Sequence, residues 1–132
     1  MSKPSSRANF AYWSPSGWAS HMPSANSGSA YVVTDSRGFA SGDFIYSDHL
    51  QTWILIYMVK QLDSTFHFRY STTGLIQGPY TEPAVLYKTT PAKDDFNFAG
   101  HAYGGYDSKG KSVILSWTYD KDKTMMAKVK FE

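Results

Sequence analysis

The sequence contains no cysteine, which excludes disulfide bonds, thiol nucleophiles and cysteine-based zinc sites together. It leaves the cellular compartment open, because secreted proteins can fold without disulfides. No apolar run approaches the roughly 18 residues that a membrane-spanning helix needs. The first ten residues, MSKPSSRANF, lack the apolar stretch of a signal peptide. We therefore expect no membrane partner and no signal peptide in this chain.

Neither sign of charge dominates the sequence. Thirteen basic residues face eleven acidic ones, which gives a net charge of +2, and the basic residues are scattered along the chain. Scattered charge argues against a nucleic-acid partner. The lysines of KDK and KVK near the end are expected to be solvated strand and turn positions. The sequence also lacks a GxSxG motif and a phosphate loop, and its four histidines are dispersed, so we expect no metal site and no cofactor.

Aromatic residues are abundant: ten Tyr, eight Phe and four Trp. Aromatic residues favour strands, and their flat faces suit both packing between sheets and stacking on sugar rings. Apolar or alternating segments are separated by turn residues, and no stretch keeps a helical period. The sequence therefore predicts an all-β protein, with strands over residues 10–13, 30–35, 40–47, 52–59, 65–72, 84–88, 98–106, 112–119 and 125–132.

Four details of these segments predict local structure. The run TWILIYMV, Thr52 to Val59, is almost wholly apolar, as expected of a strand covered on both faces. Pro83 precedes the strand at 84–88 and predicts an edge position for it. Arg69 lies in an alternating strand, where we expect it to bond protein carbonyls or a carboxylate. The sequence DSKG, Asp107 to Gly110, predicts a tight turn.

The chain repeats itself after about sixty residues. The segment YSDHLQTWILIYM, from Tyr46, is similar to the segment YDSKGKSVILSWTY, from Tyr106. One unit of four strands runs over 40–88, and a second begins at Phe98 and holds three strands. Repeated four-stranded antiparallel units are typical of β-propeller blades. The alternative is a β-sandwich of two similar sheets.

The domain organisation follows from this repeat. We expect residues 1–9 to be a loose arm and residues 10–132 to form a single domain of propeller blades. Within it, 10–39 would be the remnant of a preceding blade, 40–97 a full blade and 98–132 the final blade. About two blades would thus be present.

Several long phrases carry a resemblance to a known family: YSDHLQTWILIYM, STFHFRYST, LYKTTPA, FAGHAYGGYD and VILSWTYD. Over residues 10–132 the chain resembles the C-terminal part of a fungal secreted domain of unknown function. That domain is related to endo-D-arabinanases and, through them, to the five-bladed propellers of glycoside hydrolase family 43. The resemblance implies secretion and a carbohydrate partner. It places the catalytic carboxylates in N-terminal blades that have no counterpart here, so no catalytic residue is assigned.

Five residues are candidates for a substrate site. Asp43 in SGDF and His101 in AGHA take matching places in the two units, each after a glycine that would let an inner strand approach a crowded axis. Asp43 could act as an acid, a base or a neighbour that tunes a pKa, and His101 could bond a sugar or orient a carboxylate. The alternative is that both bond backbone groups. Asp35 and Arg37 lie in a turn that could reach a pocket rim, and Tyr103 is a further candidate.

Three functions follow from these observations. The chain could be a glycosidase-like propeller or a fragment of one, which only the resemblance supports. It could be a non-catalytic carbohydrate-binding module. It could also be a structural homo-oligomer in which several chains complete one ring. Because glycoside hydrolysis needs two carboxylates flanking one bond and no such pair is evident, the sequence favours the second and third functions.

Overall fold

The computed structural model describes residues 10–14, 16–24, 38–59, 63–93 and 95–132. The chain divides into two compact units, residues 1–34 and 35–132, and each is described by itself. All strands in the described ranges are antiparallel, and these ranges contain no helix, so the all-β prediction is confirmed. The described residues form no helix that could span a membrane. The loose arm and the strand expected at 30–35 lie outside the described residues.

The first unit contains a short hairpin of β1 (Tyr12–Ser14) and β2 (Gly17–Ala19). The Ser14 hydroxyl donates to the Gly17 carbonyl at 2.7 Å, and Gly17 takes a φ of 106°, which favours glycine. The sequence predicted the first of these strands but not the second. That the hairpin is the remnant of a preceding blade stays a prediction.

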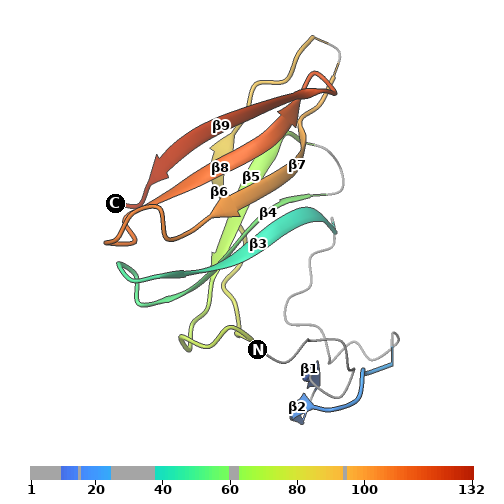
Figure 1. The fold of residues 1–132 in the computed structure, drawn as a ribbon, viewed down its shortest axis with the longest axis vertical. Coiled ribbons are helices and arrows are strands. Elements are labelled where there is room, and N and C mark those ends of the chain that lie inside the picture. Colours follow the sequence, from blue (N-terminus) through green and yellow to red (C-terminus); the bar gives the residue numbers. More distant parts are fainter. Residues whose placement is uncertain (1–9, 15, 25–37, 60–62, 94) are drawn as a thin grey trace, which may run out of the picture. The chain divides into compact units, whose positions relative to one another are not determined.

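The second unit consists of a four-stranded and a three-stranded sheet, each a meander in chain order (Figure 1). This arrangement agrees with the predicted units of four and three strands, and β6 lies at an edge, as Pro83 indicated. The first strand begins at Phe39, one residue before the predicted start. The strands of the first sheet are β3 (Phe39–Ser47), β4 (Thr52–Val59), β5 (Thr65–Tyr70) and β6 (Ala84–Lys88), and those of the second are β7 (Phe98–Tyr103), β8 (Ser112–Tyr119) and β9 (Lys123–Lys130).

The repeat in the sequence is also a repeat in strand register. Strands β4 and β8 begin and end sixty residues apart. In the first sheet Asp43 lies opposite Ile56, and in the second His101 lies opposite Ser116, which is the residue sixty positions after Ile56. Asp43 and His101 therefore occupy equivalent positions, and the alignment of SGDF with AGHA is confirmed.

The two sheets pack with non-equivalent faces in contact. The core joins one face of the first sheet to Val113, Leu115 and Trp117 of β8. The sixty-residue counterparts of these three residues are on β4, at positions that alternate with its core residues, so they lie on the opposite face of the first sheet. Successive blades of a propeller have this relation, whereas a sandwich related by a two-fold axis brings equivalent faces together. The core residues of the first sheet are Ile54, Ile56, Met58 and Phe66.

Two glycines allow close packing around this core. A Cβ on Gly100 would lie 2.5 Å from Met58 Sδ and 2.6 Å from a ring carbon of Phe66. A Cβ on Gly42 would lie 2.5 Å from the Cβ of Tyr57. The glycines therefore serve close approach to β4 and β5, whereas the sequence had suggested approach to a central axis.

The hairpin turns of the two sheets also meet. Asp107 accepts a hydrogen bond from Lys109 N–H at 3.0 Å and one from the Ser112 hydroxyl at 2.9 Å, and Gly110 has a φ of 62°. The predicted DSKG turn is thus confirmed. The Ser47 hydroxyl, at the end of β3, donates to the Gly110 carbonyl at 3.0 Å, which ties the turn of the second sheet to the first.

Truncating Trp117 should destabilise the protein more than truncating Trp53. Trp117 is 6% exposed and packs against the rings of Phe66 and Tyr87, whereas Trp53 is only half-buried beside Tyr46. For Trp117→Ala we expect a loss of about 3–5 kcal/mol, as for large-to-small changes in cores. Urea denaturation followed by circular dichroism measures both losses. Equal losses for Trp117→Ala and Trp53→Ala would contradict this description of the core.

The turn predicts a pH dependence of stability. Hydrogen bonds from Lys109 N–H and the Ser112 hydroxyl lower the pKa of Asp107 below its ordinary value of 3.8. A carboxylate with a lowered pKa stabilises the fold above that ordinary value and loses this contribution as the pH falls through the folded-state pKa. Asp107→Asn should therefore make stability less dependent on pH below about pH 4. Denaturation series at several acidic pH values measure this, and an unchanged dependence would contradict it.

Candidate functional site

Asp43 and His101 meet at the junction of the two sheets. Asp43 Oδ2 accepts a hydrogen bond from Ala102 N–H at 2.8 Å and lies 3.2 Å from His101 Nδ1. Their side chains are 35% and 51% exposed. The two residues, which the sequence grouped as site candidates, thus lie near one another, and Asp43 bonds a backbone group, as in the alternative considered from the sequence.

The position of Asp43 follows from the free edge of β7. Among the residues that the structure describes, this strand pairs only with β8, so the N–H groups on its other side need partners from elsewhere. The carboxylate of Asp43 supplies one for Ala102 and aligns the imidazole of His101 at the same time. Because a carboxylate can only accept, His101 Nδ1 carries the hydrogen, and Nε2 of the neutral ring is an acceptor.

A depression of about 430 Å³ lies beside this pair. Phe96 is 40% exposed and packs against Phe98 with ring centroids 5.8 Å apart. The hydroxyl of Ser41, two residues before Asp43 on β3, is buried and has no hydrogen-bond partner among the described residues. The depression thus combines an aromatic surface with polar groups. Its lining residues are Ala40, Ser41, Phe96, Phe98, Ala99 and His101.

Tyr103 belongs to a different part of the surface. Its hydroxyl lies 3.1 Å from the hydroxyl of Ser116, and it lines a shallow depression of about 310 Å³ with Tyr106, Ile114 and Met126. The sequence had grouped Tyr103 with Asp43 and His101, but the structure does not bring its ring into their depression. Asp35 and Arg37 lie outside the described residues.

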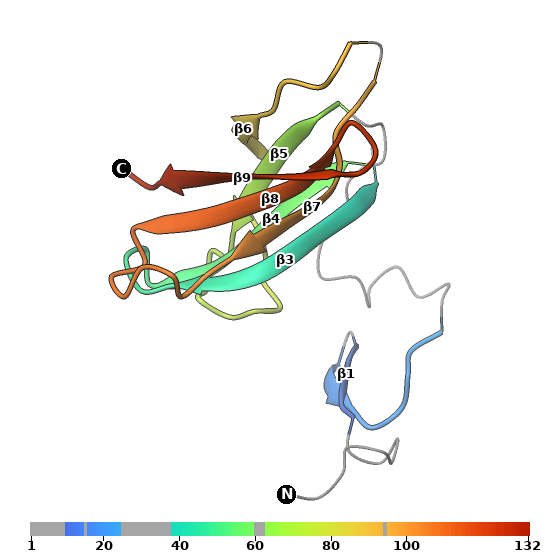
Figure 2. The same cartoon turned by 45° about the horizontal axis from the view of Figure 1, so that its top comes forward.

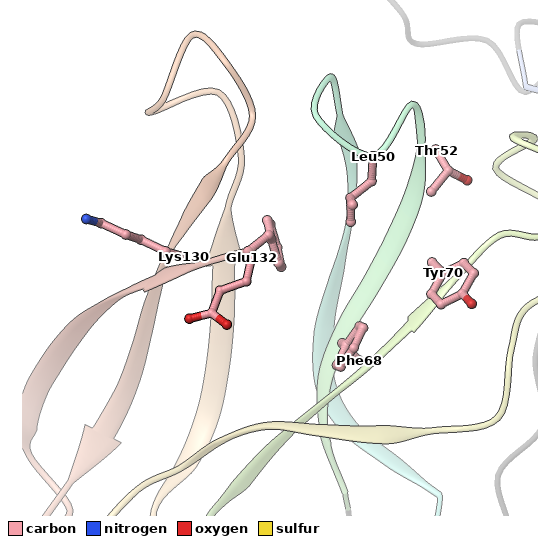
Figure 3. Close-up of a pocket in the computed structure, with 7 residues that line it drawn as sticks. Leu50, Thr52, Phe68, Tyr70, Lys130 and Glu132 are labelled. Carbon is pink, nitrogen blue, oxygen red and sulfur yellow. The ribbon is translucent and has the colours of Figure 1, made fainter.

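A third depression was not foreseen from the sequence. This cleft has a volume of about 490 Å³, and Figure 3 shows β5 residues on one side of it and the end of β9 on the other. Tyr70, which lines it, is 44% exposed. The lysines of KVK are exposed, as expected. The cleft is lined by Leu50, Thr52, Phe68, Tyr70, Lys130, Phe131 and Glu132.

Arg69 is buried, and its guanidinium group donates hydrogen bonds to other groups of the protein. Its Nη1 donates to the Thr81 carbonyl at 3.2 Å and its Nε to the Tyr57 hydroxyl at 3.3 Å. The expectation that this arginine bonds a carbonyl is confirmed. Within the described ranges, no group of three or more acidic or histidine side chains is placed to hold a metal ion.

The chain matches no known protein family, no curated protein and no solved structure. The resemblance to arabinanase-related domains therefore stays a prediction, and the chemistry rests on the residues themselves. Among the described residues that line the Asp43–His101 depression there is no carboxylate, and Asp43 itself already bonds a backbone N–H. Such a site can bind polar ligands by hydrogen bonds and aromatic contact.

Asp43→Ala should destabilise the protein, whereas His101→Ala should change stability little. Removing the carboxylate leaves the partly buried N–H of Ala102 without its partner, which costs about 1–3 kcal/mol. The side chain of His101 is half-exposed, so its loss leaves fewer groups unsatisfied. Thermal denaturation of both variants, with Asp43→Asn as the isosteric control, measures the difference. A loss for His101→Ala as large as that for Asp43→Ala would contradict it.

Proposed function

We propose that this protein is a carbohydrate-binding module of the glycosidase-like propeller type and that it does not cleave its ligand. The ligand would lie in the depression formed by His101, Ser41 and Phe96, with Asp43 holding the imidazole. The observation that supports this most is the exposed ring of Phe96 beside the hydrogen-bonded pair of Asp43 and His101. The resemblance to secreted arabinanase-related domains supports the same proposal, and with it secretion of the protein.

The chemistry of sugars fits these groups. One face of a pyranose or furanose ring is apolar and packs on an aromatic side chain. Its hydroxyls both donate and accept, so they can donate to Nε2 of His101. A depression of this volume lies within the range of small-ligand sites. A short saccharide, one to three residues long, would fill it.

The absence of a second carboxylate from the depression supports binding over cleavage. Retaining and inverting glycosidases need two carboxylates about 5–5.5 Å or 6.5–9.5 Å apart, one on each side of the scissile bond. Asp43 lies beside the depression, and its Oδ2 is engaged with Ala102 N–H and His101. No carboxylate lines the depression in the part of the chain that the structure describes.

A glycan array that includes D-arabino-oligosaccharides tests the proposal, together with a reducing-sugar assay on the same compounds. We expect binding without release of reducing ends. Phe96→Ala and His101→Ala should each weaken binding about tenfold, which is the effect of losing one stacking or hydrogen-bonding group. Isothermal titration with the best array ligand measures these changes.

Tyr70→Ala is the matched control, because it removes an exposed aromatic ring from the cleft of Figure 3 and leaves the Asp43–His101 depression intact. We expect this variant to bind normally. If Tyr70→Ala abolishes binding while Phe96→Ala does not, the ligand lies in the other cleft. Release of reducing ends would exclude the non-catalytic function.

A further inference from the structure

The three-stranded sheet has an open outer edge. In the four-stranded sheet β6 pairs with the outer side of β5, but the second sheet ends at β9, which within the described ranges pairs with β8 alone (Figure 2). Met125 and Met126 of β9 are 44% and 63% exposed. A strand of eight residues with one free edge is a template for pairing with another chain.

The hydrogen-bond pattern identifies the groups on this edge. The N–H of Phe131 donates to the Lys111 carbonyl at 2.7 Å, and the β8–β9 register continues without a shift from Lys130 to Lys123. Antiparallel strands alternate between bonded and non-bonded pairs, so the odd-numbered residues of β9 bond β8. The N–H and C=O groups of the even-numbered residues therefore point to the open edge. These residues are Thr124, Met126, Lys128 and Lys130.

We propose that two copies of this chain associate by antiparallel pairing of their β9 edges around a two-fold axis at Met126. In this register Lys130 of one copy lies opposite Asp122 of the other, and Lys128 lies opposite Thr124. Opposite charges across a strand pair stabilise it, and the symmetry supplies this ion pair twice. The two three-stranded sheets become one sheet of six strands.

Neighbouring registers are less favourable. Moving the axis one residue toward the C-terminus places Lys128 opposite Met126 and Lys130 opposite Thr124, so that no acid faces either lysine. Moving it one residue toward the N-terminus places Lys128 opposite Asp122 and Lys130 opposite Asp120, whose carboxylate bonds Lys123. Asp120 and Lys121 also have φ angles of 49° and 67°, which end the extended conformation. Lysines on an edge usually prevent pairing. Of these three registers, the one centred on Met126 places Lys130 opposite Asp122, which directly precedes β9 and whose N–H bonds the Asp120 carbonyl, so this pair is a contact between side chains.

The apolar surface beside β9 adds to the contact. The side chains of the even-numbered residues lie on the outer face of the sheet, where Met126 borders the depression formed with Tyr103, Tyr106 and Ile114. The two-fold axis would place the two Met126 side chains next to each other. The two depressions would then form one apolar surface across the dimer.

Analytical ultracentrifugation over a concentration series tests the proposal. We expect a reversible equilibrium between the monomer of 14.8 kDa and a species of twice that mass. Lys130→Asp and Asp122→Lys should each weaken association about tenfold, because each places like charges opposite one another twice. The double variant Asp122→Lys/Lys130→Asp should restore it. Lys109→Asp, a charge change in an exposed turn away from the edge, is the control and should have no effect.

A second variant tests the backbone pairing itself. Met126→Pro removes an N–H that points to the open edge and leaves the hydrogen bonds to β8 in place. We expect it to remain folded and monomeric. Amide hydrogen exchange at Thr124, Met126 and Lys128 should slow as the wild-type dimer forms. A chain that stays monomeric at millimolar concentration would overturn the proposal, and so would a dimer that both single charge changes leave intact.

Discussion

Packing between opposite faces of a repeated sheet determines most of this structure. One face of the first sheet packs against the opposite face of the second. Strand β4 carries apolar residues on both of its faces, is buried along nearly its whole length and lacks the alternation of a half-exposed strand. The repeated strand sequence places Val113, Leu115 and Trp117 on the face of the second sheet that meets the first.

The candidate site is a consequence of the same packing. Stacking brings the inner edge of β7 against β3, and an edge N–H at this junction requires an acceptor. Asp43 provides it, and because His101 occupies the equivalent position in the next sheet, the two side chains meet. The Asp43 carboxylate connects β3 to β7 by hydrogen bonds, so it cannot move freely during a reaction. Its orientation of His101 is nevertheless well suited to holding an acceptor nitrogen toward a ligand.

Sequence reasoning predicted those features that the repeat encodes. The strand bounds of β4 and β8, the turn at Asp107 and the proximity of Asp43 to His101 follow from aligning one unit on the other. Strand β6 has no counterpart in the second unit, and its bounds were predicted from its own sequence. Features without a repeated signal were missed. Strand β2 is three residues long and too short to show alternation. Tyr103 follows His101 by two residues, yet its depression depends on Met126 of β9, a contact that spacing along the chain does not reveal.

The outer face of the second sheet shows why its edge, and not this face, is the better contact for a second copy. At the positions where the first sheet carries Ile56 and Met58, the second carries Ser116 and Thr118. A further sheet stacked there would lose apolar contact at the centre of the interface, where burial contributes most. The hydroxyl of the buried Ser116 bonds Tyr103, which is 48% exposed and which a stacked sheet would have to cover or displace. A ring built by continued stacking of copies is therefore disfavoured, whereas edge pairing at β9 uses backbone groups that need partners and leaves Ser116 in place.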